Sequence, residues 1–146
     1  MDSAVHYQDA LQFASEQYYA GVQGHLWVPS SNLEVQSVID LKQAFHSDGV
    51  WIAVSDTDTE GQWIATAGPY NGTDLSDLIY WRNSEPGGGI VENCVVIDDT
   101  YQARDYVCAD TNSKYIVEFE CSRGKRFNDQ GTACVGMHGS MRPSIE

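Results

Sequence analysis

Four cysteines constrain the fold of this 146-residue chain more than any other feature of its sequence. They are Cys94, Cys108, Cys121 and Cys134, an even number at moderate spacings and without a Cys-x-x-Cys motif. This pattern is typical of two disulfides and not of a zinc site, and it leaves all three pairings open. Because disulfides persist in oxidising compartments, we expect an extracellular or cell-surface protein.

The chain is strongly acidic, with a formal net charge of −13. A surface of this sign repels phosphate backbones, so nucleic acid is not an expected partner. Two interpretations of the acidity remain: it keeps a secreted protein in solution, or several carboxylates converge on a hard cation such as calcium. The sequence contains no apolar run of about 18 residues, so we expect no membrane insertion. It also lacks the motifs of common hydrolases and nucleotide enzymes, so we expect no enzyme.

Helical periodicity comes first along the chain, and strand patterns follow. Apolar residues recur at helical spacing over residues 7–19, and Ser31-x-x-Glu34 is a capping box that opens a second helix whose apolar stripe runs to residue 45. Short strands are expected at residues 24–28, 50–54, 94–97, 105–108 and 115–120. Between them, residues 66–92 are rich in Gly, Pro, Asn and Ser. Loops this long are usually functional or disordered, and the apolar segment ending at Trp81 predicts an ordered one.

Five short motifs resemble, in the correct order, those of the C-type lectin-like domain. They are Gly24-His25-Leu26 with Ser31 to Glu34, Trp51 to Asp56 with Glu60-Gly61-Gln62-Trp63, Trp81 with Glu85-Pro86, Glu92-Asn93-Cys94, and Cys108. The resemblance covers residues 7–118 and implies an α+β fold, with two helices flanking small antiparallel sheets and a long loop region. It also implies a Cys94–Cys108 disulfide, which leaves Cys121 to pair with Cys134.

The resemblance further implies a calcium site in the long loop, where the ion chelates vicinal hydroxyls of a sugar. Glu85, Glu92 and Asp105 match primary ligands, whereas Gly87 and Arg104 stand where asparagines would be. Nearby side chains that could substitute are Asn83, Asp98 and Asp99. An auxiliary calcium site maps to Asp56, Glu60 and Asn93, together with Glu92, and Gly88 stands where an acid is usual. The Glu85-Pro86 bond is expected to be cis, as is typical of the family.

Two functions follow from this mixture of retained and lost ligands. The first is glycan recognition through the long loop, with calcium as the organising ion. The alternative is a calcium-independent domain that binds a protein ligand, favoured by Gly87 and Arg104. A bidentate contact from Arg104 to Glu85 or Glu92 could then hold the loop without metal.

Three further expectations concern other parts of the chain. Ala14 and Val117 stand where the family has its other disulfide, so we predict that they pack together. Residues 1–121 are expected to form the domain, and residues 122–146 resemble the start of a cysteine-rich repeat in a longer multidomain chain. The histidines have no metal-binding spacing, and His25 is expected to lie in the core or at its rim; the four are His6, His25, His46 and His138.

Overall fold

The computed structural model describes residues 4–31, 34, 36–38, 40, 49–98, 100, 102–111, 113–122 and 124–136. Helix α1 (Tyr7–Ser15) buries Tyr7, Ala10 and Ala14 against the body of the domain. The expected helix over residues 7–19 is therefore too long, because residues 18 and 19 form strand β1 (Tyr18–Tyr19). This strand pairs with β2 (Val22–Gln23) across a two-residue turn in which Ala20 and Gly21 both have positive φ, at 49° and 77°. Tight hairpin geometry prevails here over helical periodicity.

The second helix is described only in part. Residues 34, 36–38 and 40 are helical, and Val38 is the described member of the predicted apolar stripe and is buried. The hydroxyl of Ser31 accepts the backbone N–H of Glu34 at 3.2 Å, as the capping box predicts. The carboxylate of Glu34 accepts the N–H of Ser30 at 2.7 Å, one residue earlier than the motif implies. The rest of the stripe, residues 33, 35, 39, 41 and 45, lies outside the described residues.

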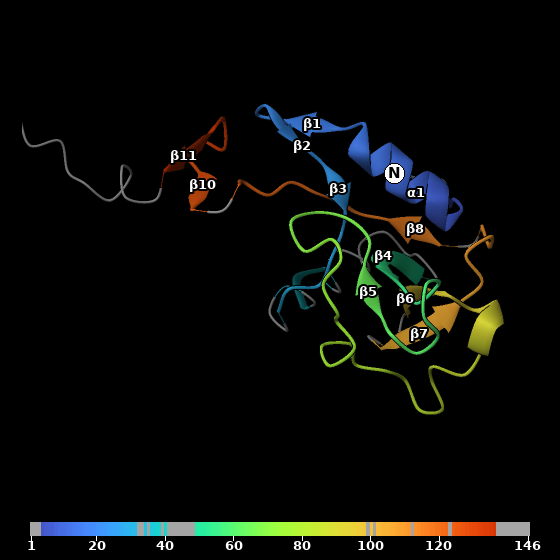
Figure 1. Cartoon of the computed structure of the whole chain (residues 1–146). Coiled ribbons are helices and arrows are strands. Elements are labelled where there is room, and N and C mark those ends of the chain that lie inside the picture. Colours follow the sequence, from blue (N-terminus) through green and yellow to red (C-terminus); the bar gives the residue numbers. More distant parts are fainter. Residues whose placement is uncertain are drawn as a thin grey trace, which may run out of the picture.

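A five-stranded sheet forms the centre of the domain (Figure 1). Its order is β5 (Ile64–Ala65), β4 (Gly49–Ser55), β6 (Cys94–Asp98) and β7 (Ala103–Tyr106), all antiparallel, with β8 (Lys114–Tyr115) parallel to β4. Every residue of β4 and β6 is buried, which explains their nearly continuous apolar sequences. Trp51 on β4 meets the ring of Tyr7 on α1 edge to face, with centroids 5.5 Å apart, so the core lies between helix and sheet.

The predicted strands differ from the observed ones in their bounds. The strands expected at residues 50–54 and 94–97 are slightly longer, as β4 and β6. The strand expected at residues 24–28 is shorter, because only residues 25 and 26 form β3 and the N–H of Val28 donates to the side chain of Glu118 instead. The strand expected at residues 105–108 is β7, which ends at Tyr106, because the carbonyl of Cys108 accepts the N–H of Tyr7 at 3.1 Å and so leaves the sheet. The strand expected at residues 115–120 is divided into β8 and β9 (Val117–Glu118), which belong to different sheets. Strand β9 pairs antiparallel with β3 (His25–Leu26).

Gly24 lies between the end of α1 and strand β9. A Cβ at this position would lie 2.8 Å from the carbonyl oxygen of Ala14 and 2.6 Å from Cγ1 of Val117. Ala14 is fully buried and Val117 is partly buried against the same core cluster. Ala14 and Val117, which stand where the family has its other disulfide, therefore both lie next to Gly24.

Both sequential disulfides are confirmed, since Cys94 is bonded to Cys108 and Cys121 to Cys134. The second closes a hairpin of β10 (Lys125–Phe127) and β11 (Cys134–Gly136), beyond the main sheets in Figure 1. The Tyr19 ring lies between Phe119 and Phe127, with centroids 5.8 and 5.7 Å away.

A domain boundary at residue 121 stays a prediction. Within the described residues, no helix is long and apolar enough to cross a bilayer.

Candidate functional site

The long loop is ordered although it contains almost no regular structure. Its one short helix is the 3₁₀ turn η1 (Gly89–Val91). The ring of Trp81 packs on that of Trp63 with centroids 4.9 Å apart, which anchors the loop to the core. The backbone of the loop is bonded to the edge of β7, because the N–H of Arg82 donates to Ala103 at 2.9 Å and the N–H of Ala103 donates to Tyr80 at 2.8 Å. The tertiary contacts thus hold the loop in one conformation beside the sheet.

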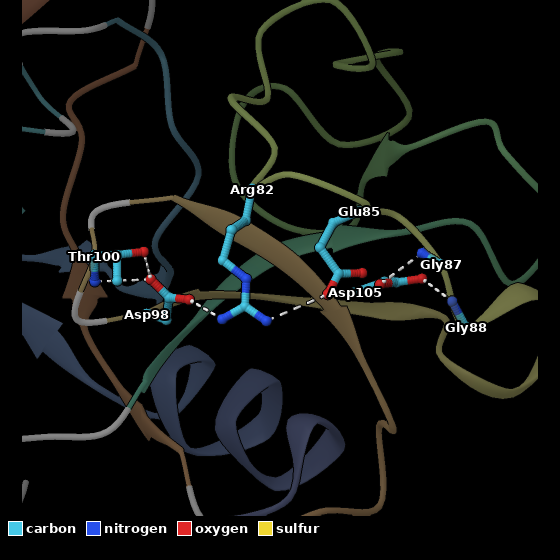
Figure 2. A network of polar contacts seen from close by, with 7 residues as sticks. All are labelled: Arg82, Glu85, Gly87, Gly88, Asp98, Thr100 and Asp105. Carbon is cyan, nitrogen blue, oxygen red and sulfur yellow. Dashed lines mark hydrogen bonds and ion pairs between the residues drawn. The ribbon is translucent and has the colours of Figure 1, made fainter.

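Asp105 lies beneath the turn at the tip of this loop. Its carboxylate accepts the backbone N–H of Gly87 at 3.1 Å and that of Gly88 at 2.8 Å, as Figure 2 shows. Only 3% of Asp105 is exposed. The Glu85-Pro86 bond immediately before these glycines is cis, as expected. One predicted ligand is therefore already engaged in shaping the loop.

Arg82 connects the loop to strand β6. Its guanidinium lies between two carboxylates, 3.2 Å from Asp98 and 3.7 Å from Glu85 (Figure 2). Burial opposes ionisation of Asp98, but hydrogen bonds from Thr100 and the charge of Arg82 outweigh it and lower the pKa of that carboxyl. Asp98 is consequently an ion-pair partner of the loop and is not free to replace a missing ligand. Of the other two expected substitutes, Asn83 is exposed and Asp99 lies outside the described residues.

Negative charge accumulates around Asp105. Burial raises the pKa of Glu85, and a hydrogen bond and charge repulsion from Asp105 raise it further. Burial also raises the pKa of Glu92, followed by repulsion from Asp105, although Arg104 partly offsets this. Glu60 follows the same pattern, with its pKa raised by desolvation and by the charges of Asp56 and Asp105. The structure therefore brings the predicted primary and auxiliary carboxylates into one electrostatic cluster.

Asp56 is the most buried member of the predicted auxiliary site, at 2% exposed. One of its oxygens, Oδ2, accepts the N–H of Gly61 at 2.8 Å, so the residue does organise the turn before that glycine. The other, Oδ1, is buried and has no hydrogen-bond partner. The N–H of Asp56 donates to the carbonyl of Asn93 at 3.3 Å, which joins two predicted ligands through the backbone. A buried carboxylate oxygen without a donor is a position that a cation can satisfy.

The residues that depart from the family pattern have clear structural consequences. Gly87 offers no side-chain oxygen, and a Cβ at Gly88 would lie 2.4 Å from Cβ of Glu92, so Glu92 occupies the space of an acid at that position. The Arg104 guanidinium lies over the Tyr106 ring, 4.5 Å from its centroid. Among the described residues, no carboxylate lies within 4.0 Å of Arg104; the expected contact to Glu85 comes from Arg82 instead.

Sequence reasoning overlooked Arg82, although it directly follows Trp81 of the loop motif. Its place beside that motif was the available signal, but its partner Asp98 lies in strand β6, which is distant from it in the sequence.

The spacing of the loop carboxylates is also wider than a preformed site requires. In the described part of the chain, no three of them have ligand oxygens that all lie within 4.8 Å of one another. Coordination of one ion by Glu85, Glu92 and Asp105 together requires these side chains to turn inward.

The helix on a small antiparallel sheet, the ordered loop with its cis proline and the Cys94–Cys108 disulfide define a C-type lectin-like domain. Over 100 residues, or 66% of the chain, the sequence is 32% identical to a tetranectin-like protein of Carcharhinus perezii and 29% identical to human C-type lectin domain family 3 member A. The chain spans about half the length of these curated relatives, 57% and 48% respectively. No protein-family model matches it.

A solved structure agrees with this assignment of the fold. The cow C-type carbohydrate-recognition domain of CD23, determined in the presence of a GlcNAc2Man3 oligosaccharide, superposes with a TM-score of 0.63 and 21% identity. The superposition covers 82% of this chain and 84% of that one. At this identity the likeness concerns the fold.

Proposed function

We propose that this chain is an extracellular recognition module that binds glycans through its long loop region, with calcium as the organising ion. The observation that carries the proposal is the carboxylate cluster around Asp105, in which Glu60, Glu85 and Glu92 all have raised pKa values. Burial, followed by repulsion from neighbouring carboxylates, disfavours the charged forms of these groups, and a bound cation favours them. The relatives point the same way, since the CD23 domain was studied with an oligosaccharide.

The residues fit calcium better at the auxiliary position than at the primary one. Asp56 supplies a buried oxygen without a donor, and Glu60, Glu92 and Asn93 add oxygen ligands, which is the donor chemistry that calcium prefers. Calcium bound there neutralises the cluster and orders the side chains beneath the loop. The primary group of Glu85, Glu92 and Asp105 retains acidic oxygens but lacks two amide ligands, at Gly87 and Arg104.

The second candidate is recognition of a protein ligand without calcium. Its support is twofold: Arg82 already holds the loop through ion pairs with Asp98 and Glu85, and apolar side chains are exposed around the site. The exposed side chains are Leu78, Tyr80, Ile90 and Val91, and Ile90 is 81% exposed. Exposed apolar side chains are typical of protein interfaces where they form a contiguous patch.

A glycan array probed with the purified domain distinguishes the two functions. We expect calcium to produce binding that a chelator removes. Glu92→Gln should also remove it, whereas Asp77→Asn, an exposed carboxylate-to-amide change outside the cluster, should not. Absence of any glycan signal with saturating calcium contradicts the proposal. Binding to a cell-surface protein that persists in chelator then supports the second candidate.

A further inference from the structure

The pairing of strands β3 and β9 places three potential metal ligands on one face. His25 lies directly opposite Glu118 in the antiparallel register. Glu120 follows Glu118 by two residues, and side chains at this spacing point to the same side of an extended chain. Directly opposed residues have Cβ atoms about 5 Å apart. Segments that are distant in the sequence therefore meet here through backbone pairing alone.

The side chains of these residues converge closely. A ring nitrogen of His25 and one carboxylate oxygen from each of Glu118 and Glu120 all lie within 4.8 Å of one another. No other His, Cys, Asp or Glu residues in the described part of the chain form such a group. We call this group the β3–β9 triad. Its separations suit three ligands around a single ion, whose bonds to nitrogen and oxygen are about 2.0–2.2 Å.

The surroundings of the His25 ring suit a metal ligand. It is only 9% exposed, and its Nδ1 lies 2.9 Å from the carbonyl of Leu26, to which an Nδ1–H can donate. Its Nε2 is buried and has no hydrogen-bond partner. Metal-binding histidines usually donate one ring N–H to a carbonyl or carboxylate and keep the lone pair of the other nitrogen for the metal. Nδ1 also lies 3.8 Å from Oε2 of Glu118, so the imidazole is beside that carboxylate, and the buried Nε2 is the nitrogen that has no partner in the protein.

The charge around the triad also favours a cation. The carboxyl of Glu118 has the carboxyls of Glu34 and Glu120 beside it, and the backbone N–H of Val28 donates to its Oε2 at 3.2 Å. A divalent ion supplies the positive charge that such a group of acidic oxygens favours.

We propose that His25, Glu118 and Glu120 form a binding site for a zinc-type divalent cation, separate from the carboxylate cluster of the long loop. One imidazole and two carboxylates are ligands that zinc accepts, whereas calcium and magnesium select oxygen alone. Thiolates do not compete, because all four cysteines are in disulfides. His25 and Glu120 also line a cavity of about 470 Å³, through which an ion can enter and which leaves a coordination position open.

Such an ion joins β3 to β9, two strands that are distant in the sequence. Because binding requires the folded register, it stabilises the folded state in proportion to metal concentration. The melting temperature of the metal-free domain, with both disulfides intact, should therefore rise on addition of ZnCl2. Equilibrium dialysis should find one zinc per chain, and equal concentrations of calcium or magnesium should not displace it.

Variants test the assignment. Glu120→Gln and His25→Gln should each weaken zinc binding at least about tenfold. Glu120 is half-buried and tolerates the change, so the test stands even if the buried His25 variant folds poorly. The controls are His6→Gln, an exposed histidine, and Glu92→Gln in the loop cluster; both should bind zinc as the unmodified chain does. No stoichiometric zinc, or zinc affinity that Glu120→Gln leaves unchanged, overturns the proposal, as does loss of zinc in Glu92→Gln.

Discussion

Arg82 places its Nη1 atom 3.2 Å from Oδ2 of Asp98, and this ion pair joins the long loop to strand β6. The side chain of Asp98 is almost fully buried, whereas that of Arg82 is 42% exposed. The loop is thus held by an arginine before any ion binds.

Removal of this arginine should destabilise the metal-free domain. Arg82→Met retains the aliphatic stem but leaves the buried Asp98 carboxylate without its cation, so we expect a loss of about 1 kcal/mol in the free energy of unfolding. Urea denaturation in chelator measures it. Arg126→Met is the matched control, because its ion pair with Asp129 is on the surface and its loss should change stability by less than about 0.5 kcal/mol. Equal effects of the two variants contradict a special role for Arg82.

The same pair predicts a dependence on acid. The folded pKa of Asp98 is lowered, so its ionised form contributes stability above the ordinary value of 3.8 and loses it as the pH falls through the folded pKa. Asp98→Asn removes this contribution. The difference in unfolding free energy between the two proteins should be constant near neutral pH and shrink below about pH 4. If the difference in unfolding free energy instead grows as the pH falls, the pKa of Asp98 is not lowered in the folded protein.

Gly24 should tolerate no side chain. The Cβ of Gly24→Ala would collide with Cγ1 of Val117 at 2.6 Å and with the backbone carbonyl of Ala14 at 2.8 Å. We expect a cost of about 1–3 kcal/mol in thermal unfolding, because a backbone atom cannot move aside easily. Gly136→Ala is the control, since a Cβ there meets nothing within 4 Å. If both variants melt alike, α1 and β9 do not approach as closely as described.

Calcium should stabilise the domain through the loop cluster. An ion that binds only the folded state adds about 2.7 kcal/mol at a hundredfold excess over Kd. We therefore expect the melting temperature to fall when a chelator is added, and Glu92→Gln to abolish that fall. Asp77→Asn, outside the cluster, should retain it. An identical melting curve with calcium and with chelator counts against an ion in the loop and in favour of a loop held by Arg82 and its other contacts within the protein.

Much of this architecture follows from local patterns. The buried strands around Trp51 and Val96 were predictable because continuous apolar runs must lie inside a sheet. The Ser31 cap was predictable because its hydroxyl serves a backbone group only three residues away. The disulfides and the cis bond before Pro86 followed from motif resemblance, and the structure agrees with both. By contrast, the end of helix α1 was misplaced, since residues 18–19 fit a helix until the turn at Ala20 is known.

By itself, the sequence determined which segments are buried and which carboxylates belong to the motifs of the loop region. These properties depend on neighbouring residues and on the average hydrophobicity of each segment. Only the tertiary structure decided that Arg82 and not Arg104 holds the loop, and that His25 meets Glu118 and Glu120. Such contacts depend on the register in which distant strands pair. A shift of one residue would turn these side chains to the opposite face, and no local pattern specifies that register.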